Sequence, residues 1–177
     1  MTPDDETEKK ILKVPHTVAL FLLFILLALL YAGTTNRTSG SAERIFSIRG
    51  HTISVETADT MGELLKGLGG RKSLSGKRGL FFVFPESGRH GIWMKGMLFP
   101  IDVVWLKETQ TNANCALNDT EKGKELCLVV VDVLENLSPE TFPEVFYPTN
   151  DARYVVELKA GTIQERGIKN GDRAILR

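Results

Sequence analysis

The sequence contains few of the residues that build metal and redox sites. Only two cysteines and three histidines occur among its 177 residues. The histidines (His16, His51 and His90) are widely separated, and there is no HExxH motif or close group of His and Cys, so no metal site is expected. Cys115 and Cys127 do not form a CxxC pair, which argues against a redox motif.

An excess of charge of either sign is also missing. Lys plus Arg and Asp plus Glu both total 22, for a formal net charge of +0 at pH 7. Nucleic-acid binding requires a basic surface, so no nucleic-acid partner is expected. A glycine-rich phosphate loop precedes a helix, whereas the glycines within residues 67–70 follow an expected helix, and no GxSxG motif occurs. No cofactor is therefore predicted.

Long hydrophobic runs are absent except for one near the N-terminus. Residues 18–32 are almost entirely Leu, Phe, Ile and Ala, without a charge. A helix with no polar face cannot be solvated in water, whereas in lipid its backbone is satisfied internally. Residues 18–33 are therefore predicted to be a transmembrane signal anchor, with Tyr31 at the membrane interface. A cleaved signal peptide and a buried helix are the alternatives, although the bulky Tyr31 stands where cleavage requires a small residue.

Basic residues predict the orientation of this segment. Three lysines lie within residues 1–17, whereas the nearest basic residues downstream are Arg37 and Arg44. Because basic residues favour the cytoplasmic side, residues 1–17 are predicted to be a cytoplasmic tail and the domain to lie on the extracytoplasmic side. Residues 34–43 are rich in Gly, Ser and Thr and are predicted to be a flexible linker. The predicted partner of this region is the lipid bilayer.

The predicted compartment bears on the two cysteines. Thiols outside the cytoplasm tend to be oxidised. We therefore expect Cys115 and Cys127 to form a structural disulfide that closes a small loop and stabilises it by about 3 kcal/mol. Two free thiols are the alternative.

Residues 44–177 have the pattern of a compact β-rich domain, in which short hydrophobic runs alternate with turn residues. Pro85 is expected to end one central strand. Residues 107–125 are polar and are expected to form the enlarged tip of a hairpin, and residues 137–147 are expected to be irregular because of their prolines. Strands are expected at residues 45–48, 52–57, 79–84, 89–94, 101–106, 126–134, 154–158 and 173–176.

Two short helices are expected in this domain. Thr60 and Glu63 form a capping-box pattern for the first helix, which ends at the glycines after it. Thr162 and Glu165 repeat the pattern for the second, which ends at Gly167. The predicted fold class is α+β and mainly β: a compact bent sheet or partly closed barrel with two short helices, preceded by one transmembrane helix.

Residues 79–106 carry a specific set of motifs. They read GLFFVFP, then IWMK, then FPIDVVWL, and YVVELKAG and GIKNGD follow near the C-terminus. In this order the motifs resemble the family of domains of unknown function 192 (DUF192), a group of small prokaryotic domains. The resemblance implies a fold and a set of positions but no reaction. The chain departs from the family pattern at Gly96, where members have Asn, and at the long polar loop of residues 107–125, where they have a short turn.

Lys95 and Asp102 stand out because both lie among large hydrophobic residues. A buried charge must be paired or neutralised. One interpretation is a structural ion pair of Lys95 with Asp102 or with Glu157, or a Lys95 ammonium that reaches solvent beside Trp93. The other is a cleft lined by Trp93, Met94, Lys95 and His90, where the indole would bind an apolar or sugar-like face and the ammonium an anionic group.

Arg71 is a further candidate, since it occupies a position of the family pattern. Its guanidinium is expected to bind a carboxylate such as Asp59, or an anionic ligand. No catalytic residue and no metal ligand is assigned. The ligand-binding candidates are therefore Trp93, Lys95, Arg71, Asp102, His90 and Glu157, and the disulfide candidates are Cys115 and Cys127.

These features favour an uncharacterised, membrane-anchored extracytoplasmic domain that serves as a small binding or accessory module of the cell envelope. The expected partner is a small ligand or another envelope protein. A hydrolase-like enzyme that acts on envelope material, with Asp102, Lys95 and Glu157 as acid and base, is a less favoured alternative. A structural partner of another envelope protein, bound through the hydrophobic segment of residues 142–147, is the third hypothesis.

Overall fold

A computed structural model describes residues 43–109 and 125–177. These residues belong to one compact unit, Ser41–Arg177. The predicted cytoplasmic tail (1–17), signal anchor (18–33) and almost all of the predicted linker (34–43) lie outside the described residues. Within the described ranges, no helix combines the length and hydrophobicity needed to cross a membrane.

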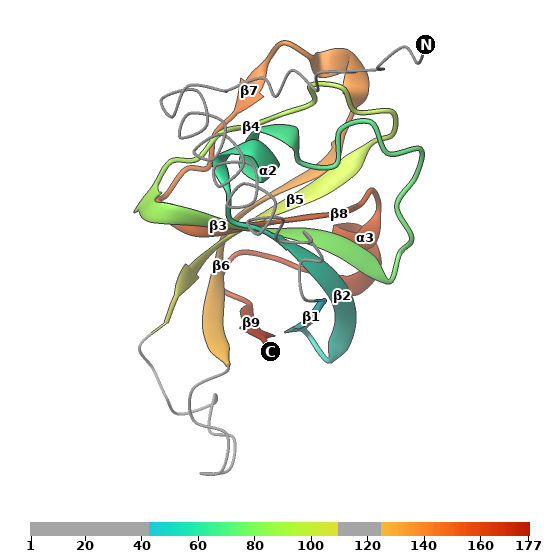
Figure 1. The fold of residues 1–177 in the computed structure, drawn as a ribbon. Helices are drawn as coiled ribbons and strands as arrows, with labels where there is room; N and C mark the ends of the chain where they lie inside the picture. The colour runs from blue at the N-terminus through green and yellow to red at the C-terminus, as the bar shows by residue number, and fades with distance from the viewer. Residues whose placement is uncertain (1–42, 110–124) are drawn as a thin grey trace, which may run out of the picture. The chain divides into compact units, whose positions relative to one another are not determined.

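Seven strands close into a barrel in the order β1-β2-β3-β8-β5-β6-β9 (Figure 1). Strand β1 pairs with both β2 and β9, which closes the barrel. All neighbouring strands are antiparallel except β2 and β3, which are parallel. The mainly β prediction is confirmed, and the barrel is closed instead of partly open. The strands are β1 (Arg44–Ile48), β2 (His51–Ala58), β3 (Arg78–Gly88), β5 (Ile101–Glu108), β6 (Leu126–Leu137), β8 (Ala152–Lys159) and β9 (Arg173–Leu176).

Two short helices and a small second sheet complete the described fold. The helices are α2 (Met61–Lys66) and α3 (Thr162–Arg166), and a 3₁₀ turn, η2, covers Pro139–Thr141. Strands β4 (Ile92–Trp93) and β7 (Val145–Phe146) pair with each other outside the barrel. Figure 1 shows α2, β4 and β7 on one side of the barrel, away from β1 and β9.

The capping prediction is confirmed for α2 and wrong for α3. At α2, the Thr60 hydroxyl accepts from the Glu63 N–H (3.3 Å) and the Glu63 carboxylate accepts from the Thr60 N–H (3.1 Å). At α3 the N-cap is Gly161, with φ of 88° and no side-chain cap. The hydroxyl of Thr162 instead donates to the carbonyl of Lys159 (2.6 Å). Both helices end at a glycine, as expected.

Two hydrophobic clusters share the central strands. The first contains residues from all seven barrel strands, including Phe46, Phe81 and Val156, and fills the barrel. The second contains Phe82, Val103 and other residues from the opposite face of the central strands, together with residues that follow α2 and surround β4. Because β5 and β8 are buried on both faces, they read as almost continuous hydrophobic runs.

The local chain differs from the prediction in two strands. Pro85 does not end its strand, since β3 continues to Gly88. The pairing of β3 with β8 shifts register between Val83 and Gly88, and such an irregularity accommodates a residue that has no N–H to donate. The strand expected at residues 89–94 is reduced to the two residues of β4.

The predicted hairpin is confirmed, because β5 pairs with β6 in antiparallel fashion. Its tip, residues 110–124, lies outside the described residues and includes Cys115. Cys127 lies in β6 and is not a free thiol. The disulfide between Cys115 and Cys127 stays a prediction.

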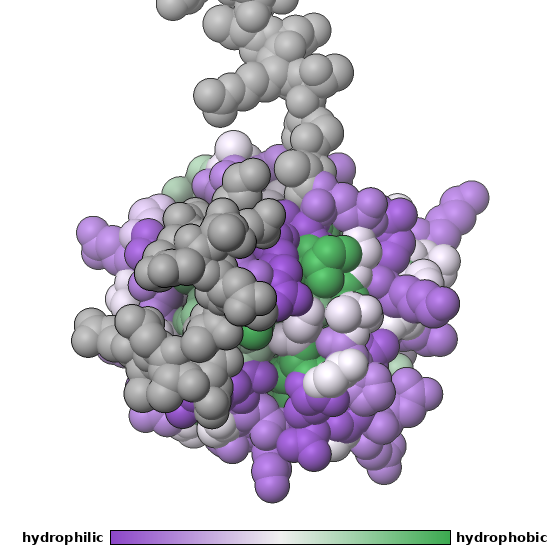
Figure 2. Space-filling model, turned by 90° about the horizontal axis from the view of Figure 1, so that it is seen from below, coloured by the Kyte–Doolittle hydropathy of each residue, from purple (hydrophilic) through white to green (hydrophobic). Residues whose placement is uncertain are grey.

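The visible part of the face that carries β1 and β9 has no large hydrophobic area (Figure 2). Viewed from that side, the visible surface is mostly hydrophilic, with hydrophobic residues in small separate spots (Figure 2). Scattered hydrophobic residues are normal on protein surfaces. The hollowed part of the molecule lies elsewhere, beside α2.

Candidate functional site

A cavity of about 500 Å³ lies between α2 and strands β3, β4, β7 and β8. This volume is typical of sites that bind small molecules. Its walls are mainly hydrophobic and aromatic, and only four charged or ionisable residues other than tyrosine contribute to them, namely Lys66, His90, Lys95 and Glu157. The apolar walls are formed chiefly by Met61, Leu64, Leu65, Phe82, Phe84, Ile92, Trp93, Met97, Val145 and Tyr147.

Four of the six predicted ligand-binding residues meet at this cavity: Trp93, Lys95, His90 and Glu157. They come from two segments that are far apart in the sequence, residues 90–95 and strand β8. Arg71 and Asp102 are not part of the lining. The fold thus brings four of the predicted residues together at the cavity, whereas Arg71 and Asp102 bind other groups of the protein.

Glu157 forms the most unusual part of the lining. Its side chain is 4% exposed, and Oε2 has no hydrogen-bond partner. Burial in an apolar environment raises the pKa of Glu157 to about 8, although the Leu68 N–H, which donates to the carboxyl, and the charge of Arg71 act in the opposite direction. Glu157 is therefore mostly protonated at neutral pH.

The strand register and one glycine place this carboxyl group. Glu157 lies opposite Leu80 of β3 and Val103 of β5, so all three side chains share the face of the sheet that looks toward α2. Helix α2 ends at Gly67, whose φ is 52°. A Cβ atom at Gly67 would lie 3.4 Å from the Glu157 Oε2 atom, an ordinary van der Waals contact. The positive φ favours glycine at this position, and the end of the helix lies beside the carboxyl.

Lys95 and Trp93 lie together at the cavity. The Lys95 Nζ atom is 5.3 Å from the centre of the Trp93 ring, within range of a cation–π interaction. Lys95 is exposed and Trp93 is half-buried. The observed geometry therefore matches the interpretation in which the Lys95 ammonium reaches solvent beside Trp93. The ring of Trp93 also contacts Phe142 edge-on, with ring centres 6.4 Å apart.

His90 is held in place by three contacts. Its ring stacks on Phe84 with ring centres 3.8 Å apart, and its Nε2 atom lies 2.8 Å from the carbonyl oxygen of Glu86. Its own carbonyl accepts a hydrogen bond from the Trp105 indole (2.9 Å). One ring nitrogen is therefore engaged by the backbone, and the fixed imidazole contributes mainly a flat wall to the cavity.

The predicted pairing of Lys95 with Asp102 is wrong. Asp102 is completely buried and accepts hydrogen bonds from the backbone N–H groups of Asn136 (2.9 Å) and Ile163 (2.7 Å). Ile163 lies in the first turn of α3, so Asp102 satisfies the helix end that Thr162 leaves uncapped. Asp102 thus has a structural task and does not line the cavity.

The proposed acid and base pair of Asp102 and Glu157 is also not formed. Asp102 lies opposite Leu158 in the β5–β8 pairing, whereas Glu157 lies opposite Val103. Neighbouring residues along a strand point to opposite faces, so the two carboxyl groups lie on opposite sides of the sheet. The enzyme hypothesis loses the carboxylate pair on which it depended.

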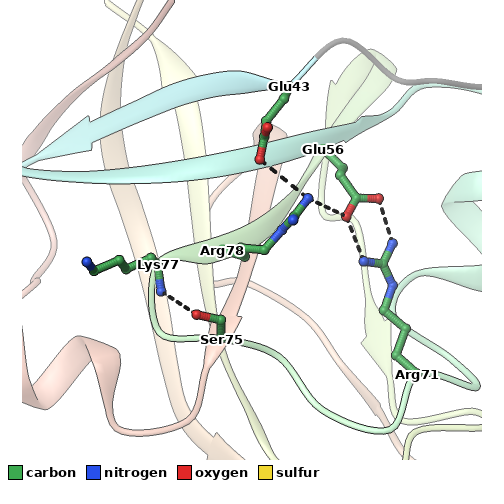
Figure 3. A network of polar contacts seen from close by, with 6 residues as sticks. All are labelled: Glu43, Glu56, Arg71, Ser75, Lys77 and Arg78. Carbon is green, nitrogen blue, oxygen red and sulfur yellow. Dashed lines mark hydrogen bonds and ion pairs between the residues drawn. The ribbon is translucent and has the colours of Figure 1, made fainter.

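Arg71 belongs to a surface ion-pair network instead of the cavity (Figure 3). Its guanidinium donates two hydrogen bonds to Glu56, at 2.7 and 2.8 Å, and Arg78 contacts both Glu56 (3.5 Å) and Glu43 (3.3 Å). The hydrogen bonds from Arg71 lower the pKa of Glu56, and those to Glu56 raise the pKa of Arg71. Arg71 thus binds a carboxylate, as expected, but the partner is Glu56 and not Asp59. Both guanidinium NH₂ groups are engaged by Glu56 and are not available for a ligand.

Sequence reasoning missed the hydrophobic rim of the cavity, which we define as Met61, Leu65, Val145 and Tyr147. These side chains line the cavity and are 69%, 56%, 36% and 59% exposed, respectively. Met61 and Leu65 are four residues apart and therefore share one face of α2. The sequence did contain a signal for this rim. Hydrophobic residues lie on more than one side of α2, and such a short helix can bury only one side, so some of them had to be exposed.

Comparisons with known proteins agree with this fold. A crystal structure of a protein from Sinorhizobium meliloti 1021, provisionally described as a transcription regulator, is 24% identical, with a TM-score of 0.60, and the match covers 75% of this chain and 91% of that one. A protein of unknown function from Novosphingobium aromaticivorans DSM 12444 is 21% identical, with a TM-score of 0.57, over 75% and 82% of the two chains. At these identities the likeness concerns the fold alone. No functionally curated protein matches the sequence.

The predicted family resemblance is confirmed. The family model DUF192, described as an uncharacterised ACR, matches residues 44–125, which include the IWMK motif and strands β1 to β5. The remaining strands of the barrel follow the matched region in the sequence. Residues 44–125 of this chain are thus similar to the DUF192 family.

Proposed function

We propose that the barrel domain is a small-molecule binding module. The observation that carries the proposal is the cavity of about 500 Å³, whose apolar walls surround a few polar groups, among them the buried carboxyl of Glu157. Binding sites for small molecules have this construction, with apolar walls for affinity and a few polar groups for orientation.

The charged groups at the cavity indicate how a ligand is oriented. Lys66 and Lys95 are both exposed and line the cavity, so they provide positive charge where an anionic group of the ligand would remain close to solvent. The Trp93 ring beside Lys95 offers a flat surface for an apolar or sugar-like body. An amphiphilic molecule with an anionic group satisfies both features.

We propose further that residues 18–33 tether this module to a bilayer, with the domain on the extracytoplasmic side. The uncharged hydrophobic run and the lysines before it support the anchor and its orientation. The absence of a free thiol at Cys127 agrees with an oxidising compartment. Protease digestion of intact and of lysed spheroplasts tests the topology, since a domain protected in intact spheroplasts but digested after lysis contradicts it.

A thermal-shift screen of the full chain with small amphiphilic anions tests the binding function. A ligand present at one hundred times its Kd stabilises the folded state by about 2.7 kcal/mol, which produces a measurable increase in Tm. Trp93→Ala and Lys95→Ala are expected to reduce that increase. Lys107→Ala removes an exposed lysine of β5 outside the cavity and serves as the matched control. Equal shifts in all four proteins would place the ligand elsewhere and contradict the proposal.

Exposed aromatic residues support a second candidate, a protein-interaction surface. Phe142 and Tyr147 are 45% and 59% exposed, and both lie close to the cavity, Phe142 through Trp93 and Tyr147 as part of the rim. Replacing both by Ser while leaving the cavity lysines intact would abolish binding of an envelope partner in a pull-down. Recovery of the same partner by the double variant would exclude this surface.

A further inference from the structure

The cavity contains a carboxyl group that the described protein leaves partly unsatisfied. The Leu68 N–H donates a hydrogen bond to the Glu157 carboxyl, but the Oε2 atom of Glu157 has no hydrogen-bond partner. Buried polar atoms nearly always have a hydrogen-bond partner, and the exceptions call for an explanation. Since Glu157 lines the cavity, a ligand group that donates a hydrogen bond there would provide the missing interaction.

The cations near Glu157 are committed to other groups. Arg71 contributes to the electrostatics of Glu157, but both arms of its guanidinium are bound to Glu56. The Lys95 ammonium lies over the Trp93 ring. Among the described ion pairs, none includes Glu157. A negative charge on this carboxyl would therefore have no close counterion within the described part of the chain.

The surroundings of the carboxyl favour a positive partner. The rings of Phe82, Phe84 and Trp93 line the same cavity. The faces of aromatic rings attract cations, most strongly where water is excluded. A carboxyl group and several aromatic rings that line one cavity form an environment for a basic nitrogen attached to an apolar body.

We propose that the ligand of this cavity carries a basic nitrogen, and that Glu157 is the residue that selects it. This inference rests on the proposed binding function and adds a chemical class to it. The nitrogen arrives as an ammonium, Glu157 binds it as a carboxylate, and the proton released from the carboxyl passes to solvent. Combined with an anionic group at Lys66 and Lys95, the preferred ligand is an apolar zwitterion.

The pH dependence follows from the proton that must leave. With a pKa of about 8, Glu157 is mostly protonated at pH 6, so ammonium binding at that pH requires its ionisation. The affinity for a cationic ligand is therefore expected to rise by up to about tenfold per pH unit below pH 8. The other ionisable groups that line the cavity are Lys66, His90, Lys95 and Tyr147, with Arg71 acting through its charge.

The test compares 1-naphthylmethylamine with 1-naphthalenemethanol, which has the same shape but carries a hydroxyl in place of the ammonium. Dissociation constants are measured by ligand-observed NMR with the full chain at pH 6, 7 and 8, and the solubilising medium alone serves as the blank. The amine is expected to bind at least about tenfold more tightly than the alcohol at pH 8, because hydrogen bonds between charged partners are roughly twice as strong as neutral ones. The ratio between the dissociation constants of the alcohol and the amine is expected to decrease toward pH 6.

Three variants assign the effect to the carboxyl. Glu157→Gln keeps the shape and removes the charge, so the amine should lose its preference and its pH dependence. Glu165→Gln, on the exposed side of α3, is the matched control and should behave as the wild type. His90→Gln removes the imidazole that also lines the cavity and should leave the pH dependence in place.

Each outcome decides between the proposals. If the alcohol binds as tightly as the amine at every pH, or Glu157→Gln retains the preference, the basic nitrogen is excluded, while binding to the cavity stands. If neither compound binds at millimolar concentration, this inference fails, whereas the proposed binding function fails only if the amphiphilic anions of the thermal-shift screen also leave Tm unchanged. The pH dependence in the wild type keeps the test valid even if the Glu157 variant does not fold.

Discussion

The buried carboxyl of Glu157 predicts an unusual dependence of stability on pH. Its pKa in the folded protein is about 8, against an ordinary value of 4.5 that applies to the unfolded chain. The folded state therefore holds the proton more tightly than the unfolded state does. The contribution to stability is fully present below about pH 4.5 and is lost as the pH rises through 8.

The size of the effect follows from the difference between the two pKa values. Between them the unfolded chain releases a proton that the folded protein keeps, so stability falls by about 1.4 kcal/mol per pH unit. From pH 5 to pH 8 the loss due to this one group is roughly 3 to 4 kcal/mol. The side chain is only 4% exposed, so little of this is screened by solvent. The value is large beside a typical domain stability of 5–15 kcal/mol.

Urea denaturation at pH 5, 6, 7 and 8 measures this loss. Glu157→Gln replaces the carboxyl with an amide that does not titrate, so the variant should lack this steep decline. At pH 8 it should be more stable than the wild type by roughly 2 to 4 kcal/mol, after about 1 kcal/mol is deducted for an amide that is incompletely hydrogen-bonded. The control Glu165→Gln should follow the wild type. Parallel stability curves for wild type and Glu157→Gln would show that the carboxyl is not held protonated, and the reasoning would fail.

Three further substitutions test the roles assigned to other residues, each by urea denaturation or by Tm. Asp102→Ala leaves the backbone N–H groups of Asn136 and Ile163 without their acceptor, the second of them buried, and should cost roughly 3 kcal/mol or more, so a loss below about 1 kcal/mol would contradict its capping role. Arg71→Lys breaks the two-pronged contact with Glu56 and, since the pair is partly exposed, should cost only about 1 kcal/mol; a severe loss would indicate a larger role. Gly91→Ala places a Cβ atom 2.5 Å from Val145, so it should separate β4 from β7 at a cost of roughly 1 to 3 kcal/mol, and an unchanged Tm would refute the close approach.

The fold was predictable where local signals and burial agree. Residues 79–84 and 154–158 were expected to be central strands and lie in β3 and β8, and Thr60 with Glu63 marked the start of α2. The same pattern failed at Thr162, because the acceptor for the first turn of α3 comes from Asp102, 61 residues earlier in the chain. A capping motif reports local chemistry only, and a distant side chain can replace it.

The cavity was only partly predictable. Trp93, Lys95 and His90 were found because they surround one motif, and Glu157 because it is a lone acid within an apolar strand. The rim could not be predicted, since it depends on how α2 and β7 pack beside the barrel. Arg71 was correctly expected to bind a carboxylate, but its partner Glu56 lies in a strand whose parallel pairing with β3 has no signature in the sequence.

Asp102 and Glu157 show why the register of one strand pair decides what this barrel can do. Both are lone acids in apolar strands, and their sequence signals are equivalent. In the observed register Asp102 pairs with Leu158, so one acid caps a helix on one face and the other lines the cavity on the opposite face. A shift of one residue would place both carboxyl groups on the same face, where like charges would raise a pKa and form an acid and base pair. The observed register instead leaves Glu157 alone, and an isolated carboxyl among aromatic rings is suited to recognising a cation.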